Sequence, residues 1–187
     1  MNVVIFGPPG AGKGTQAQNI VKKFNLHQIS TGDLLRNEIK NRSEIGKEIE
    51  KIISKGDFAT DEIVNKLIKN IIFDPQKKDK LIFDGYPRSL SQAKNLDLLL
   101  DISNQKIDFI FFLNVNKDTI VRRIEKRKIL EKRPDDDLKT TLKRYDTYME
   151  TTRPVLDFYS SRNYFYEIDG SEKIEVISSK IEQIIAV

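Results

Sequence analysis

The sequence has no cysteine and only one histidine among its 187 residues. The lack of cysteine excludes a disulfide framework and a thiolate zinc site, so the fold must be held together by its core. The single histidine, His27, has no carboxylate or serine partner in its motif, which favours a surface or core position over acid–base work. No apolar run approaches the ~18 residues of a membrane span, and the N-terminus starts with a strand-like run instead of a leader. We therefore expect a cytoplasmic enzyme with no membrane partner.

The charge balance is close to even. The chain carries 32 Lys and Arg against 28 Asp and Glu, which gives a formal charge of +4. This excess suits polyphosphate substrates as well as it suits a lysine-rich surface. Nucleic-acid binding would need clustered basic residues with aromatic stacking platforms, whereas here acids lie between the lysines. We therefore predict no nucleic-acid partner; salt-dependent retention of oligonucleotides would be needed to support one.

Short apolar runs alternate with longer helical patterns, and the length predicts one domain with small insertions. This alternation predicts an α/β fold with a five-stranded parallel sheet flanked by helices. The predicted strands are Val3–Phe6, His27–Ile29, Leu81–Phe83, Phe109–Leu113 and Tyr164–Ile168. The clearest helical patterns are Ala17–Phe24, Ser91–Leu100 and Ile174–Ile185. Residues that could carry chemistry come just after the strand ends, where ligands bind in open α/β sheets.

Two segments interrupt the alternation without adding a strand. Residues 30–59 read as two helices, and residues 126–137 form a basic stretch that we expect to be a short lid loop. The predicted core domain then consists of residues 1–29, 60–125 and 138–187. Both insertions are candidate mobile flaps, of the kind that keep water away from a reacting group.

The strongest motif is a glycine-rich loop, Gly-Pro-Pro-Gly-Ala-Gly-Lys-Gly-Thr at residues 7–15, directly after the first predicted strand. Its backbone N–H groups, the start of a helix near Lys13 and the Lys13 ammonium together predict a cradle for a nucleoside triphosphate. Gly14 stands where such loops usually carry a hydroxyl for Mg²⁺, and the hydroxyl comes one residue later, at Thr15. The predicted triphosphate-binding residues of the loop are Gly10, Ala11, Gly12, Lys13, Gly14 and Thr15.

A second motif, at residues 80–88, is a buried strand that ends in Asp84, followed by a turn and Arg88. Because Gly14 offers no hydroxyl, we expect Mg²⁺ to be held by phosphates and waters, with Asp84 accepting hydrogen bonds from those waters. Gln92 follows one helical turn after Arg88, and its amide has the donor and acceptor needed to read the edge of a base.

Two further segments carry arginines. Ser30 and Asp33 fit a helix capping box, which leaves Arg36 unexplained. Arg123 and Arg127 stand four residues apart on a predicted helix, where like charges repel by a few tenths of a kcal/mol unless an anion joins them. Two more arginines follow, Arg133 before three aspartates, and then Arg144.

These motifs occur in one order from Val3 to Glu172, and together the chain resembles the nucleoside monophosphate kinases, adenylate kinases in particular. The resemblance implies a P-loop NTPase-type sheet with a helical NMP-binding insertion. It implies reversible phosphoryl transfer from ATP to AMP, giving two ADP, with Mg²⁺ accompanying ATP, in a monomer. Only five residues separate Arg127 from Arg133, which matches the short-lid form and, with no cysteine, excludes zinc.

The resemblance also assigns roles to residues. Catalytic roles fall on Lys13, Arg88, Arg123, Arg133 and Arg144. ATP contacts beyond the loop fall on Arg123, Arg127 and Glu172. AMP contacts fall on Thr31, Arg36, Asp57, Phe58, Ala59, Gly85, Tyr86, Pro87, Arg88, Gln92, Arg133 and Arg144. No general base is required, because the attacking phosphate oxygen of AMP is already anionic.

Two other functions fit part of the sequence. A UMP/CMP kinase of the same architecture is disfavoured by Thr31 and Gln92, because pyrimidine-directed relatives tend to carry Ala and Asn at these places. A nucleotide-binding module without turnover is disfavoured by the retained arginines. We expect the C-terminal aromatic residues, Tyr148 and Tyr159 among them, to pack in the core.

Overall fold

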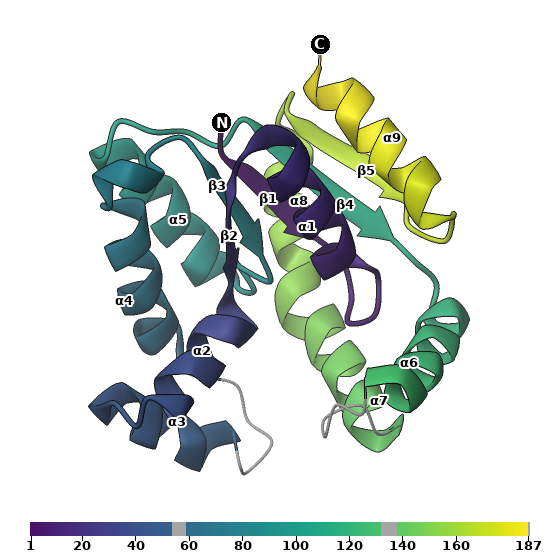
Figure 1. The fold of residues 1–187 in the computed structure, drawn as a ribbon, viewed down its shortest axis with the longest axis horizontal. Helices are drawn as coiled ribbons and strands as arrows, with labels where there is room; N and C mark the ends of the chain where they lie inside the picture. The colour runs from purple at the N-terminus through teal and green to yellow at the C-terminus, as the bar shows by residue number, and fades with distance from the viewer. Residues whose placement is uncertain (54–58, 132–137, 187) are drawn as a thin grey trace.

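The computed structural model of the chain describes residues 1–53, 59–131 and 138–186. Its centre is a five-stranded parallel sheet in the order β2-β3-β1-β4-β5 (Figure 1). The strands are β1 (Val3–Phe6), β2 (His27–Ser30), β3 (Leu81–Asp84), β4 (Phe109–Asn114) and β5 (Phe165–Asp169). Each boundary lies within one residue of its predicted position, which confirms the five-stranded parallel sheet.

Helices connect the strands and cover both faces of the sheet. They are α1 (Lys13–Phe24), α2 (Thr31–Lys40), α3 (Glu44–Ile53), α4 (Asp61–Ile72), α5 (Leu90–Ile102), α6 (Lys117–Glu131), α7 (Leu138–Thr147), α8 (Arg153–Ser160) and α9 (Ile174–Ile185). A 3₁₀ turn, η1 (Pro75–Lys77), precedes β3, and a π-helical turn, η2 (Tyr148–Thr152), joins α7 to α8.

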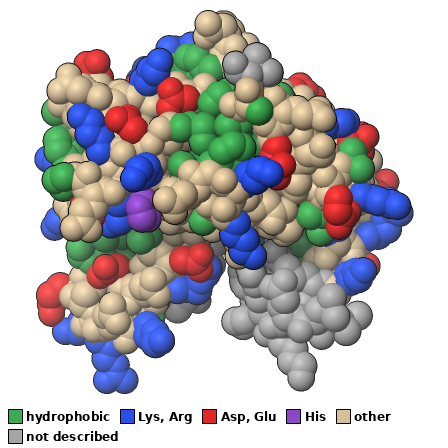
Figure 2. All heavy atoms as spheres, turned by 45° about the horizontal axis from the view of Figure 1, so that its top comes forward, with side chains coloured by type: hydrophobic (Ala, Val, Ile, Leu, Met, Phe, Trp, Pro, Cys, Tyr) green, Lys and Arg blue, Asp and Glu red, His purple; other side chains and the backbone are tan. Residues whose placement is uncertain are grey.

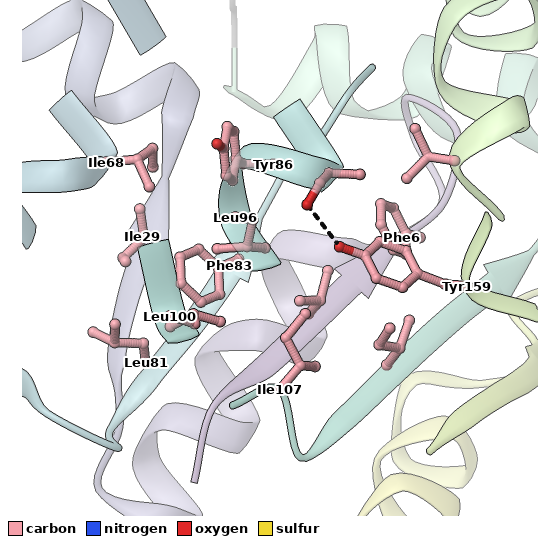
Figure 3. Packing of buried hydrophobic residues seen from close by; sticks show 14 of the residues in the cluster. Phe6, Ile29, Ile68, Leu81, Phe83, Tyr86, Leu96, Leu100, Ile107 and Tyr159 are labelled. Atoms are coloured by element: carbon pink, nitrogen blue, oxygen red, sulfur yellow. Dashed lines mark hydrogen bonds between the residues drawn. The ribbon is translucent and has the colours of Figure 1, made fainter. Parts of the chain in front are cut away.

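The core lies on both faces of the sheet because successive side chains of a strand point to opposite faces. Val4 and Phe6 of β1 pack in one cluster with residues of α4, α5 and α8, part of which Figure 3 shows. Val3 and Ile5 pack in a second cluster with residues of α1, α6 and α9. All four residues of β1 are apolar, and all four are buried because both faces of the strand are covered. Such double burial places the loop that follows β1 on a rigid base.

The described part of the first insertion, residues 30–53 and 59, contains the two predicted helices. Helices α2 and α3 lie beyond the carboxyl end of β2 (Figure 1). Ser30 caps α2, since its Oγ accepts a hydrogen bond of 3.3 Å from the N–H of Asp33. Leu35, Ile49 and Ile63 form a small separate cluster under α2 and α3. The insertion is therefore tied to the start of α4 by apolar packing.

The second insertion departs from the expected loop. Helix α6 continues to Glu131, so residues 126–131 are helical, and residues 132–137 lie outside the described part of the chain. The expectation of a loop over the whole of 126–137 is wrong in its first half. The reason is that straight-chain residues such as Lys126 lose little rotamer freedom in a helix and so favour its continuation.

Two surface expectations can be compared with the structure. His27 is exposed at the start of β2, where it is the purple side chain of Figure 2. Its exposure confirms the surface position, one of the two positions expected for it. Across residues 1–53, 59–131 and 138–186, no helix combines the length and apolarity needed to cross a membrane.

Candidate active site

The glycine-rich loop connects β1 to α1, which begins at Lys13 as predicted. Gly10 and Gly12 have φ angles of 82° and 96°, in the left-handed region that favours glycine. The Lys13 ammonium donates hydrogen bonds to the carbonyls of Gly7 and Pro8, at 2.8 Å and 3.0 Å. These bonds draw the lysine side chain back across the loop.

Helix α6 supports this loop from one side. The guanidinium of Arg123 donates a hydrogen bond of 3.2 Å to the carbonyl of Ala11. A Cβ atom at Gly10 would lie 3.1 Å from Ile124, so the loop packs closely against α6. Arg123 is thereby fixed next to the glycine-rich loop.

Asp84 ends β3, the strand next to β1, and it faces the loop. A Cβ atom at Gly14 would lie 3.5 Å from Asp84 Oδ2, so glycine at this position leaves room beside the carboxylate. The same oxygen accepts a hydrogen bond of 3.1 Å from Gln28 Nε2. No group of three or more His, Cys, Asp or Glu side chains suitable for a metal ion occurs among the described residues. One carboxylate beside a phosphate cradle fits an ion that takes most of its ligands from phosphates and waters.

Arg88 follows β3 and is locked by the turn that precedes it. Its Nε donates to the Gly85 carbonyl at 2.7 Å, and its Nη2 donates to Thr31 Oγ1 at 3.2 Å. Thr31 in turn donates to the same carbonyl at 2.9 Å. Gly85 has a φ of 76°, and a Cβ atom there would lie 3.0 Å from Arg88 Nη2. Glycine is therefore needed at this turn both for its backbone conformation and for the space of the guanidinium.

The electrostatic setting of Arg88 favours an anion. Burial, together with the positive charges of Arg144 and Arg36 and against an opposing effect of Asp84, lowers the pKa of its guanidinium to about 10. Arginine stays protonated at neutral pH even so. A desolvated cation among like charges gains more from a phosphate group than an exposed one does.

Gln92 stands at the start of α5 and is 4% exposed. Its Oε1 accepts a hydrogen bond of 2.7 Å from the N–H of Arg88, and its Nε2 donates one of 2.7 Å to Asp61 Oδ1. Ser89 caps the helix, because its Oγ accepts from the N–H of Gln92. The side chain is thus held at both ends within the wall of a cavity.

That cavity, of about 230 Å³, lies beyond the carboxyl ends of β1 and β3. Many of the predicted site residues line it together: Lys13, Thr31, Ala59, Gly85, Pro87, Arg88, Gln92 and Arg144. The sequence reasoning missed other lining residues: Leu35, Asp61, Val64, Ser89, Thr147, Tyr148, Thr151 and Thr152. Asp61 comes two residues after Ala59, in a segment to which AMP contacts were assigned, but it was given no role itself. Tyr148, expected in the core, has no local signal that marks it as a cavity residue.

The comparison with known proteins agrees with this geometry. A family model with the description Adenylate kinase matches residues 5–164. The chain belongs to the adenylate kinase family.

Proteins named adenylate kinase are similar to it over nearly their whole length. The protein of Pelagibacter ubique strain HTCC1062 is 47% identical, with all of both chains covered. That of Caulobacter sp. strain K31 is 37% identical, covering 100% of this chain and 99% of the relative. That of Mycoplasma mycoides subsp. mycoides SC is 36% identical, covering 92% of each.

Some residues to which the adenylate kinase resemblance assigned roles lie away from the cavity lining. Tyr86 is fully buried in the core, as Figure 3 shows, and its hydroxyl donates to Asn65 Oδ1 at 2.8 Å. Arg36 is exposed and pairs with Asp33 at 2.5 Å. Glu172 accepts a hydrogen bond of 2.7 Å from Lys180.

Other residues with adenylate kinase roles lie outside the described part. Asp57, Phe58 and Arg133 fall in the segments that are not described, and so does the side chain of Arg127, whose backbone belongs to α6.

Proposed function

We propose that this member of the adenylate kinase family is an ATP:AMP phosphotransferase that interconverts ATP and AMP with two ADP. The observation that carries the proposal is the convergence of two kinds of group on one cavity. Lys13 comes from the phosphate loop, whereas Arg88 and Gln92 come from the segment after β3. A phosphate cradle and a base-reading amide that share a cavity suit a second nucleotide next to the triphosphate.

In the proposed reaction a phosphate oxygen of AMP attacks the γ-phosphorus of ATP. A bond forms to that oxygen, the bond from the γ-phosphorus to the bridging oxygen breaks, and the electron pair stays on the β-phosphate of the departing ADP. The attacking oxygen is already anionic, so no side chain has to remove a proton. Catalysis then rests on positioning and on the neutralisation of charge.

The cations of the site divide this work. Lys13 lies where it can offset charge on the β- and γ-phosphates, and Arg123 lies beside it at the loop. Arg88 and Arg144 line the cavity, and we assign them to the phosphate of AMP, because a guanidinium fork can hold two phosphate oxygens at once. By resemblance, Arg127 and Arg133 complete the set.

Mg²⁺ would supply further neutralisation of the phosphates when it is bound with ATP. Asp84 is the residue placed to hold waters of that ion, for the reasons of space and charge given above. We further propose that the enzyme is monomeric and cytoplasmic and that it binds no zinc. The lack of cysteine supports the proposal on zinc.

Base choice is assigned to Thr31 and Gln92. Both line the cavity, and Gln92 presents an amide whose ends are fixed by neighbouring groups. The direct test measures ADP formation from ATP and MgCl₂ with AMP, UMP, CMP or GMP as the acceptor, with controls that lack acceptor or metal.

We expect efficient turnover with AMP alone. Lys13→Ala should abolish it, whereas Lys22→Ala, an exposed lysine of the same helix, should leave it unchanged. Equal rates with UMP or CMP would contradict the assignment of Thr31 and Gln92, and binding of nucleotides without ADP formation would contradict the enzymatic function.

A further inference from the structure

Asp61, the first residue of α4, bridges two helices at the cavity wall. Its Oδ1 accepts a hydrogen bond of 2.7 Å from Gln92 Nε2, and its Oδ2 accepts one of 2.7 Å from Ser89 Oγ. Both partners belong to the start of α5, and Asp61 itself lines the cavity. The carboxylate therefore joins the beginning of α4 to the residue proposed to read the base.

This contact determines which way round the Gln92 amide stands. A carboxylate only accepts hydrogen bonds and a backbone N–H only donates them. With Asp61 at one end and the Arg88 N–H at the other, the amide fits with Nε2 toward Asp61 and Oε1 toward Arg88. The reversed amide would set oxygen against the carboxylate and NH₂ against the N–H. After these two bonds the amide can still form one hydrogen bond at each end: Nε2 has a second N–H to donate, and Oε1 can accept a second hydrogen bond.

The fixed sense of the amide favours some bases over others. Adenine presents an amino donor beside a ring-nitrogen acceptor, which a glutamine amide can match with two hydrogen bonds. Guanine presents a carbonyl acceptor beside a ring N–H donor, so in the orientation of adenine it matches only the reversed amide. Uracil has a carbonyl acceptor on each side of its ring N–H, so it can match the amide in either sense. Cytosine presents the same order as adenine, and the amide does not separate these two.

We propose that Asp61 is a positioning residue that fixes the sense of the Gln92 amide and so sets the preference for AMP over GMP. This inference rests on the proposed function, because it needs Gln92 to face the base. It differs from a structural role for Asp61 at the helix start, where an acidic residue in the first turn stabilises α4 through the helix dipole. Glu62 is the next residue of that turn and is exposed, which makes it the matched control.

The test compares kcat/KM for AMP and for GMP, at saturating ATP and MgCl₂, across variants. Asp61→Ala frees one end of the amide, so we expect the AMP-to-GMP ratio to fall about tenfold or more, equivalent to about 1.4 kcal/mol. The KM for ATP should not change. Asp61→Asn should keep most of the selectivity, because its carbonyl can still accept from Nε2 while its NH₂ faces Ser89 Oγ. Glu62→Ala should keep all of it.

A double-mutant cycle with Gln92→Ala shows whether Asp61 acts through the amide. In the Gln92→Ala background, Asp61→Ala should no longer change the AMP-to-GMP ratio; a further change of the same size would overturn the proposal. If Asp61→Ala fails to fold, Asp61→Ser takes its place, since serine is well tolerated at a helix start.

The failures of the two proposals can be told apart. A wild-type enzyme that prefers AMP, together with an unchanged ratio in Asp61→Ala, would refute the role of Asp61 and leave the phosphotransferase function intact. A wild-type enzyme that turns over no monophosphate would refute the function itself, and the inference with it.

Discussion

Replacing Arg88 with lysine keeps the charge but removes the planar fork of the side chain. Two N–H groups of the guanidinium are used within the protein, toward Gly85 and Thr31, and these bonds fix its plane against the cavity. A lysine ammonium is a single centre on a flexible stem, so it cannot keep both bonds and also hold two phosphate oxygens. The Arg88→Lys variant should therefore fold normally but bind the phosphate of AMP less well.

The size of the loss follows from the bonds involved. A hydrogen bond to a charged group contributes about 1.5–3 kcal/mol, which corresponds to a factor of about 10–150 for each bond. Losing two such bonds would lower kcat/KM for AMP by roughly 10²–10⁴. The lower end of this range still lies well above the scatter of initial-rate measurements.

The assay is the initial rate of ADP formation over a range of AMP concentrations at saturating ATP. Arg122→Lys serves as the control, since Arg122 is exposed on α6 and lines no part of the cavity described here. A thermal melt of each variant checks folding. If Arg88→Lys kept its kcat/KM within about tenfold of the wild type, a loss of less than about 1.4 kcal/mol, the reasoning from bidentate geometry would be refuted.

Three further changes probe other parts of the site. Asp84→Asn should lower turnover at least about tenfold and raise the MgCl₂ concentration needed for half-maximal rate; unchanged turnover over a MgCl₂ titration would show that Asp84 has no part in holding the metal. Gly85→Ala should destabilise the fold by about 1–2 kcal/mol, because the φ angle of Gly85 is 76°. It should also raise the KM for AMP more than the KM for ATP, because the new methyl group would lie 3.0 Å from Arg88 Nη2. Equal effects on both KM values would count against that contact. Tyr148→Phe should raise the melting temperature by about 2–4 °C for each kcal/mol gained, because the buried hydroxyl of Tyr148 has no hydrogen-bond partner among the described residues. A lower melting temperature in calorimetry would mean that the hydroxyl stabilises the fold.

Much of the fold could be predicted because the sheet is covered on both faces. Strands buried in this way read as continuous apolar runs, and β1 and β4 are clear examples. Helix α9 was predicted with its observed bounds, since its apolar residues recur at helical spacing and turn residues precede it. The end of α6 was misjudged because a basic composition was given more weight than helix propensity.

The site was predictable where its residues belong to one local motif. Lys13, Arg88 and Gln92 each stand at a fixed distance from a strand end, so the topology brings them together. Asp61 and Tyr148 reach the cavity through the packing of α4 and the turn η2, which no local pattern encodes. Hydrogen bonds between helices, such as the one from Gln92 to Asp61, become visible only when the structure is known.

The order of the strands also has a consequence for how the chain is made. The central strand β1 comes first in synthesis, yet its partners in β3 and β4 follow roughly 80 and 100 residues later. At a translation rate of about 5–20 residues per second, this apolar strand waits roughly 5–20 s for its second neighbour to leave the ribosome. During that interval the segment that will support the phosphate loop is unpaired and open to chaperones. A slow codon placed before β4 should lengthen the wait and lower the yield of soluble protein.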